Sequence, residues 1–284
     1  MQVSDSPFGS HNRPPDWAAY NTRSNIKGLR MRVISFSADG IKNAAEKGFY
    51  DWLKEQDADF VCIQDLRCSE YDLQDNLFFP EEYNPYFFDD IDGKANGVAI
   101  YCRQLPKAIM TGLGFADFDM EGRYIQADYE NISIGCLLAP SAEPGNAEQQ
   151  SRKNDFYELL GNHLQKVRNK RREFVICGNW NVAHTPADVQ DTERNSTISG
   201  FLAEERQWMN ELFTEGYIDP FREINSDQDE FTWWPEGDRA TNGWRSDFQV
   251  ISKDLQYAVD YGAIYKSREF STHAPVIMDY DIEL

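Results

Sequence analysis

From residue 31 onward, short apolar runs alternate with segments of helical periodicity, and this alternation restricts the fold more than any other feature of the chain. Runs typical of buried strands occupy residues 31–37, 60–64, 97–102, 122–129, 131–140 and 173–180. Apolar side chains with helical spacing occupy residues 43–56, 154–167 and 201–216. Aromatic-rich strands are expected at residues 231–235, 245–251 and 274–282. The alternation predicts an α/β protein in which sheets pack against helices.

The chain divides into a short polar segment and one long folded region. Residues 1–30 are rich in Ser, Asn and Pro and have no hydrophobic period, so we expect a flexible N-terminal extension there. No linker-like stretch interrupts residues 31–284, which we therefore interpret as a single domain.

The charge balance argues against a protein that binds nucleic acid unaided. The chain has 28 Lys and Arg against 48 Asp and Glu, a net charge of −20, and a field this negative opposes binding to a polyanion. No apolar run approaches the roughly 18 residues of a membrane span. The five dispersed cysteines, with no C-x-x-C pair, indicate buried free thiols. Because no secretory signal is visible, we expect a cytoplasmic protein.

Seven segments in a fixed order carry a family resemblance. They read MRVISFSADG (31–40), DADFVCIQD (57–65), GVAIYCR (97–103), FVICGNWNVAH (174–184), FTWWP (231–235), GWRSDFQV (243–250) and STHAP (271–275). Together they resemble the exonuclease III and apurinic endonuclease branch of the endonuclease/exonuclease/phosphatase superfamily. The resemblance implies a four-layered α/β sandwich, in which two sheets lie face to face, helices lie outside, and a nuclease pocket lies at one end.

The resemblance also implies a chemistry, and several positions depart from it. It implies phosphodiester hydrolysis with Mg²⁺ held by carboxylates, an Asp that activates water, and a His oriented by an Asp. The two amides of the family's first-strand Asn-x-Asn-Gly motif are replaced here by Ser37 and Asp39. The metal-binding Glu is the shorter Asp65, and a Tyr is replaced by Leu138, whose side chain cannot form a hydrogen bond with a phosphate.

Two further departures affect the catalytic groups themselves. The family's Gly-Asp-x-Asn motif contains Asn179 in place of the Asp, and an amide cannot accept the proton of an attacking water. Thr272 replaces the Asp that precedes His273, so we expect the imidazole to lack an orienting carboxylate. Asn181 and Asp247 are retained. Because such groups act as a unit, these losses predict a fall in activity of many orders of magnitude.

The altered positions predict a vestigial pocket, and we expect none of its residues to be catalytic. These residues are Asp65, Asn179, Asn181, Asp247 and His273. We favour a structural role for Asp247 and His273 in a buried polar network. We expect neither a cofactor nor a bound metal. If the chain were active, Asp65 and Asp247 would be the residues that hold Mg²⁺.

Other segments resemble one group within the superfamily, the bacterial catabolite repression control (Crc) family. They are PKAIMTGLGF (106–115), GRYIQADY (122–129), NKRREFVICG (169–178), GFLAEERQWMNE (200–211) and FSTHAPVIMDYD (270–281). Members of this family keep the fold, are not active nucleases, and act with the RNA chaperone Hfq to repress translation of messages with A-rich sites. The resemblance implies Hfq and A-rich mRNA as partners in a ternary complex.

One basic cluster offers a surface for such partners. It consists of Lys166, Arg168, Lys170, Arg171 and Arg172. A solvated helix end, where cations favour the helix dipole, is the simpler interpretation of a basic run. In so acidic a chain we expect the cluster to contact phosphate or an acidic partner surface. Arg245 is a further candidate, which either pairs with Asp247 or contacts a partner.

Two enzymatic alternatives remain. One is a divergent Mg²⁺-dependent exodeoxyribonuclease III or apurinic endonuclease that uses Asp65, Asn181, Asp247 and His273 with altered ligation. The other is a phosphodiesterase acting on a small or lipid-derived phosphate, which the acidity of the chain favours over long DNA as a substrate.

Overall fold

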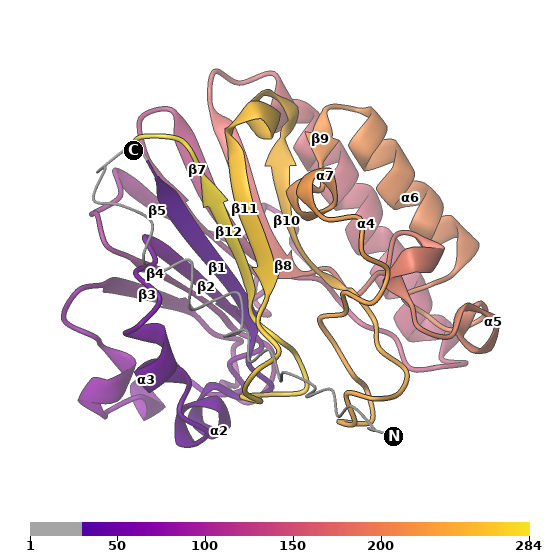
Figure 1. Ribbon diagram of the computed structural model, residues 1–284, viewed down its shortest axis with the longest axis horizontal. Helices are drawn as coiled ribbons and strands as arrows, with labels where there is room; N and C mark the ends of the chain where they lie inside the picture. Colours follow the sequence, from indigo (N-terminus) through magenta and orange to yellow (C-terminus); the bar gives the residue numbers. More distant parts are fainter. Residues whose placement is uncertain (1–29) are drawn as a thin grey trace, which may run out of the picture.

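The computed structural model describes residues 30–284, which form two six-stranded sheets that face each other (Figure 1). Residues 1–29, which make up nearly all of the predicted extension, lie outside the described residues. Arg30 is described, and its guanidinium pairs with Asp279 on the first sheet.

The first sheet has the strand order β11-β12-β1-β2-β4-β3. Its strands are β1 (Met31–Ser37), β2 (Phe60–Gln64), β3 (Asn84–Phe88), β4 (Val98–Cys102), β11 (Val259–Ile264) and β12 (Val276–Tyr280). The central pair, β1 and β2, is parallel, and all other neighbours are antiparallel. Both central strands therefore end on the same side, where the chain turns toward the site described below.

The second sheet has the order β5-β6-β7-β8-β10-β9. Its strands are β5 (Ala108–Thr111), β6 (Tyr124–Asp128), β7 (Ile132–Leu138), β8 (Glu173–Asn179), β9 (Tyr217–Ile218) and β10 (Asp247–Ser252). Again the central pair is parallel, here β7 with β8, and the other pairs are antiparallel. A parallel pair needs a crossover connection, which one long helix provides.

Helices cover the outer face of each sheet and complete four layers (Figure 1). α2 (Ile41–Glu46) and α3 (Phe49–Leu53) pack on the first sheet, and α4 (Ala147–Arg168) and α6 (Ala203–Thr214) pack on the second. The shorter helices are α5 (Thr192–Asn195), α7 (Pro220–Ile224), η1 (Glu70–Asp72), η2 (Asn76–Phe78), η3 (Pro186–Asp188) and η4 (Lys253–Ala258). The predicted four-layered, single-domain sandwich is confirmed. No helix within residues 30–284 is long and apolar enough to cross a membrane.

Apolar side chains fill three layers, one between the sheets and one under each pair of outer helices. Burial of this apolar surface is the dominant favourable contribution to folding. The five cysteines are all buried and free, as the sequence predicts. Four of them lie in the layer between the sheets: Cys62, Cys102, Cys136 and Cys177.

The single helix expected over residues 43–56 is wrong, because the chain forms two short helices there. Gly48 adopts a left-handed backbone conformation with φ of 86°, which ends the first helical turn and redirects the chain into α3. The apolar side chains Phe49 and Trp52 are still buried in the core. The apolar spacing therefore indicates helical structure correctly, but it does not show that the helix is interrupted.

The strand expected over residues 231–235 is also wrong. This segment forms only isolated bridges, which join Trp233 to Trp244 and to His273. Of its aromatic side chains, Trp233 stacks on His273 in the site, and Phe231 and Trp234 pack in the core.

Candidate functional site

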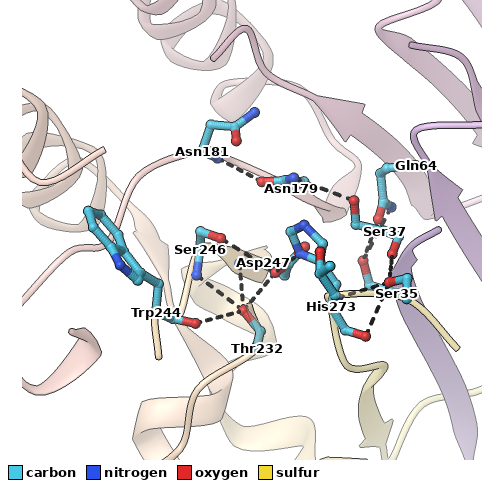
Figure 2. A network of polar contacts seen from close by, with 12 residues as sticks. Ser35, Ser37, Gln64, Asn179, Asn181, Thr232, Trp244, Ser246, Asp247 and His273 are labelled. Atoms are coloured by element: carbon cyan, nitrogen blue, oxygen red, sulfur yellow. Dashed lines mark hydrogen bonds and ion pairs between the residues drawn. The ribbon is translucent and has the colours of Figure 1, made fainter. Parts of the chain in front are cut away.

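A cavity of about 850 Å³ opens where the central strands of both sheets end. Its lining comes from the segments that follow β1, β2, β7 and β8, and it includes Asp65, Asn179, Asn181 and His273. Asp247, at the start of β10, is only 2% exposed and contacts His273 (Figure 2). The structure therefore brings together all five residues predicted to form the pocket.

An imidazole and a carboxylate form a buried pair in the cavity. His273 Nδ1 lies 2.8 Å from Asp247 Oδ2, and Thr232 Oγ1 donates a hydrogen bond to the same oxygen at 2.6 Å (Figure 2). Burial by itself lowers the pKa of His273, but Asp247, together with Asp39 and Asp65, outweighs burial and raises it. The raised pKa favours the imidazolium form.

The expectation that His273 lacks an orienting carboxylate is wrong. The carboxylate comes from Asp247, which is distant in the sequence and is brought beside His273 by the fold. Thr272, the direct neighbour, contacts a different carboxylate. Its backbone N–H donates to Asp39 Oδ2 at 3.0 Å, and its hydroxyl donates to the same oxygen.

The amide of Asn179 belongs to a chain of hydrogen bonds that joins the two sheets (Figure 2). Its Nδ2 donates to Ser37 Oγ at 3.4 Å, and its Oδ1 accepts from the backbone N–H of Asn181 at 3.0 Å. The side chain of Asn181 in turn donates to the carbonyl of Ala139 at 2.7 Å. Both amides hold neighbouring segments in place, and neither has a basic oxygen for a proton.

Two carboxylates in the cavity lining share one guanidinium. Arg67 Nη2 lies 2.6 Å from Asp65 Oδ2 and 3.1 Å from Asp39 Oδ1, and Arg67 Nε donates to Asp65 Oδ1 at 3.1 Å. Burial raises the pKa of Asp65, and Arg67 offsets only part of that effect. For Asp39, burial also acts to raise the pKa, but His273, Thr272 and Arg67 together lower it.

Sequence reasoning does not identify three residues of the site, Arg67, Thr232 and Trp233. The indole of Trp233 stacks on His273, with ring centroids 5.6 Å apart and an angle of 16° between the planes. Arg67 follows Asp65 by two residues, and a cationic residue so close to a candidate metal ligand could have identified it from the sequence. Thr232 and Trp233 are far from His273 in the sequence, and no local pattern points to their contact.

A buried ion pair supports the loop that carries Asn181. Lys153 Nζ, on α4, lies 2.6 Å from Glu205 Oε1 on α6 and donates to the carbonyl of Asn181 at 2.8 Å. The two side chains are 1% and 2% exposed. The other oxygen of Glu205 accepts hydrogen bonds from two backbone N–H groups just before α6. The loop after β8 is thus fixed to both outer helices of the second sheet.

Arg245 is not available to a partner, and it does not pair with Asp247. It is 1% exposed, with Nε 2.7 Å from Asp188 Oδ1 and Nη2 2.6 Å from Asp219 Oδ2. Its guanidinium also lies over the ring of Phe248, 4.3 Å from the centroid. Two acidic partners from distant segments hold this side chain in the interior. The prediction that Arg245 contacts a partner is therefore wrong.

The basic cluster lies at the opposite end of β8 from the cavity. Lys166 and Arg168 occupy the last turn of α4, and the other three members precede Glu173, the first residue of β8. β8 has seven residues and therefore separates the cluster from Asn179 by roughly 20 Å. Arg172 pairs with Asp128 at 2.6 Å. Three of its members, Lys170, Arg171 and Arg172, line a second cavity of about 600 Å³.

The residues of the first cavity do not fit Mg²⁺ as they are arranged. Mg²⁺ requires near-octahedral oxygen ligands. All four carboxylate oxygens of Asp39 and Asp65 already accept hydrogen bonds from protein donors. Asp247, the other predicted ligand, binds His273 and Thr232 through Oδ2. Its Oδ1 is buried without a hydrogen-bond partner, so it is the one carboxylate oxygen of these three residues that has no protein donor. In the part of the chain that the structure describes, no three His, Cys, Asp or Glu side chains are grouped as a metal site requires.

Comparison with known proteins identifies the family. A family model described as the endonuclease/exonuclease/phosphatase family matches residues 18–261. The chain belongs to this family. Its similar relatives include an exodeoxyribonuclease of Bacillus subtilis (strain 168), 29% identical over 253 residues that cover 87% of this chain and 98% of the relative. The DNA repair nuclease APEX1 of Danio rerio is 29% identical over 266 residues, which cover 90% of this chain and 84% of the relative. Similarity to the exonuclease III and apurinic endonuclease branch is thus confirmed.

Solved structures with a similar fold are known. An AP endonuclease from Archaeoglobus fulgidus superimposes with a TM-score of 0.81 at 23% identity, covering 89% of this chain and 100% of that one. The 3′ phosphatase NExo from Neisseria, bound to a product DNA hairpin, superimposes with a TM-score of 0.79 at 20% identity, covering 88% and 99%. At these identities the likeness establishes the architecture.

Proposed function

We propose that this chain is a non-catalytic member of the family. The observation that carries the proposal is the amide of Asn179. It occupies the motif position of the water-activating Asp, yet it bonds Ser37 and the Asn181 backbone and has no basicity. A positioned general base typically contributes about 10²–10⁴-fold to a rate. The Asp247–His273 pair then serves the stability of the buried network.

We further propose that the protein represses translation in the manner of the Crc family, with Hfq and A-rich mRNA as its partners. Support comes from residues 106–115, 122–129 and 200–211, which resemble that family outside the nuclease motifs. A net charge of −20 favours a role in which another protein presents the RNA. The basic cluster provides the contact surface, since Lys170 and Arg171 form no ion pair within residues 30–284.

A second candidate function is a divergent Mg²⁺-dependent exonuclease III or apurinic endonuclease. The retained pair of Asp247 and His273, 2.8 Å apart, favours it, as does the sequence similarity to active nucleases. The arrangement of Asp39, Asp65 and Arg67 weighs against it. The two functions predict opposite results in a cleavage assay.

With Mg²⁺ and a duplex that contains an abasic site, we expect the protein to leave the DNA intact while an active exonuclease III relative cleaves it. The physical reason is the missing base at residue 179. The same preparation is tested for binding to A-rich RNA by gel shift, with and without Hfq. We expect a slower complex only when Hfq is present, because Hfq supplies the RNA affinity that this acidic chain lacks.

The two parts of this experiment fail separately. Cleavage by the wild-type protein within about tenfold of the control rate establishes the nuclease and overturns the non-catalytic proposal. Absence of any complex with Hfq and RNA overturns the regulatory proposal alone. A variant with Asn179→Asp, Asp65→Glu and Thr272→Asp restores the motif residues, and cleavage by it but not by the wild type attributes the inactivity to those positions.

Reversing the charge of Lys170 and Arg171 together is expected to weaken the complex with Hfq and RNA by at least roughly tenfold, since both cations are exposed and unpaired. Arg172 is left unchanged because it pairs with Asp128. The measurement is a titration of the gel shift. The matched control changes Lys47 and Lys94 to Glu, since both are exposed, form no ion pair within residues 30–284, and Lys94 lies at the first cavity, away from the basic cluster. Equal losses in both double variants would contradict a specific contact and indicate a general charge effect.

A further inference from the structure

We propose that Arg67 takes the place of a divalent metal ion in the cavity, as the permanent positive charge shared by Asp39 and Asp65. This role explains how a pocket of the nuclease type stays intact without metal. It rests on the proposed non-catalytic function, but metal binding tests it and cleavage does not, so the two can fail separately.

The guanidinium occupies the position between the two carboxylates. One nitrogen, Arg67 Nη2, contacts both Asp65 Oδ2 and Asp39 Oδ1, at 2.6 and 3.1 Å. Nε adds a second bond to Asp65, at 3.1 Å. The remaining oxygen, Asp39 Oδ2, accepts from the backbone N–H and the hydroxyl of Thr272. Thus each of the four oxygens that a metal would use already has a protein donor.

The backbone holds the two carboxylates close together, independently of the cation that neutralises their charge. Their side chains are only 18% and 16% exposed, and two backbone hydrogen bonds join their loops, from Ala38 to Gln64 and from Gly40 to Asp65. Asp39 and Asp65 both have left-handed backbone conformations, with φ of 50° and 59°. Partly buried like charges fixed in this way repel each other, so the site requires a cation.

The chemistry of an arginine side chain suits this position between two carboxylates. A guanidinium is planar, stays charged at all working pH values, and offers several donors to two carboxylates at once. Arg67 is itself 50% exposed, so its head group reaches the carboxylates from the solvent side and its removal leaves an accessible gap. A divalent ion is the natural occupant of that gap, because it also brings positive charge to oxygen ligands.

The test is binding of Mn²⁺ to Arg67→Met, measured by titration calorimetry on full-length protein first treated with a chelator. We expect the variant to bind Mn²⁺ at least roughly tenfold more tightly than the wild type does, because one competing positive charge has been removed. Its melting temperature is expected to fall below that of the wild type and to rise when Mn²⁺ is added. The wild-type melting temperature is expected not to respond to Mn²⁺ or to chelator.

Two further variants locate the effect. Arg194→Met removes an arginine of similar exposure, 53%, from a surface pair with Glu236, and it is expected to gain no Mn²⁺ affinity. Adding Asp65→Asn to Arg67→Met is expected to abolish the gain. If the wild type binds Mn²⁺ as tightly as Arg67→Met, or if folded Arg67→Met gains no affinity, Arg67 does not stand in for a metal. Wild-type protein that binds no Mn²⁺ yet cleaves DNA overturns the proposed function instead.

Discussion

Replacing Arg245 by methionine is expected to lower the free energy of unfolding by about 3–5 kcal/mol, the usual cost of removing one partner of a buried ion pair. The change leaves Asp188 and Asp219, which are 0% and 8% exposed, without their shared cation. Methionine approximates the length of the arginine stem, so lost packing contributes little. The measurement is equilibrium unfolding in urea at neutral pH.

The same network makes the free energy of unfolding depend on pH. Burial acts to raise the pKa of Asp188, but Arg245 and Arg222 outweigh it and hold the pKa well below its usual range. A lowered folded-state pKa stabilises the protein above the unfolded pKa of about 3.9, and this contribution is lost as the pH falls toward the folded value. In Arg245→Met only Arg222 remains, so the loss is expected at a higher pH.

The control for this substitution is a pair on the surface. Arg194→Met breaks an ion pair in which both side chains are about half exposed, and such pairs contribute about 0–1 kcal/mol. A cost for Arg245→Met that does not exceed the cost for Arg194→Met contradicts the structural role assigned to Arg245. It would also reopen the question of whether this arginine is accessible to a partner.

The second large effect is expected for Lys153→Met, again with a loss of about 3–5 kcal/mol. The substitution leaves the carboxylate of Glu205, 2% exposed, without its cation, and it frees the carbonyl of Asn181. Urea unfolding measures the loss. Because the loop after β8 loses a bond to α4, we also expect the NMR signals of residues near Asn179 to shift.

A double variant separates the ion pair from the packing of Lys153. Glu205→Gln keeps an acceptor for the backbone N–H groups before α6 and removes the charge. Lys153→Met with Glu205→Gln is expected to be more stable than the sum of the two single losses predicts, because neither charge is then buried alone. Strict additivity would show that the two groups do not interact.

The sequence predicts the central strands well and the edge strands poorly, and the difference has a physical cause. β2, β4, β6 and β7 are buried at every residue, so they appear as continuous apolar runs. β3, β5 and β11 lie at sheet edges, and most of their residues are half buried or exposed. The apolar stretches of such strands are short, only residues 86–88 in β3 and 108–110 in β5, so the sequence does not separate them from apolar residues in a loop.

The site shows a similar limit. Motif positions predict that Asp65, Asn179, Asn181, Asp247 and His273 gather in one pocket, and they do. The partners of these residues depend on tertiary geometry. The orienting carboxylate of His273 comes from Asp247, although Thr272 is its neighbour in the chain. For the same reason Arg245, which has two acidic partners from distant segments, could not be placed by its spacing from Asp247.

Because the thiols lie between the sheets, the rate of their alkylation reports how often the two sheets separate. Burial raises the pKa of Cys62 and Cys136 well above the ordinary thiol value, so hardly any reactive thiolate exists while the layer is closed. A small maleimide therefore modifies these two side chains only in molecules whose sheets have separated. The labelling rate of Cys62 and Cys136 then follows the population of opened molecules and does not report motions confined to the loops around the cavity.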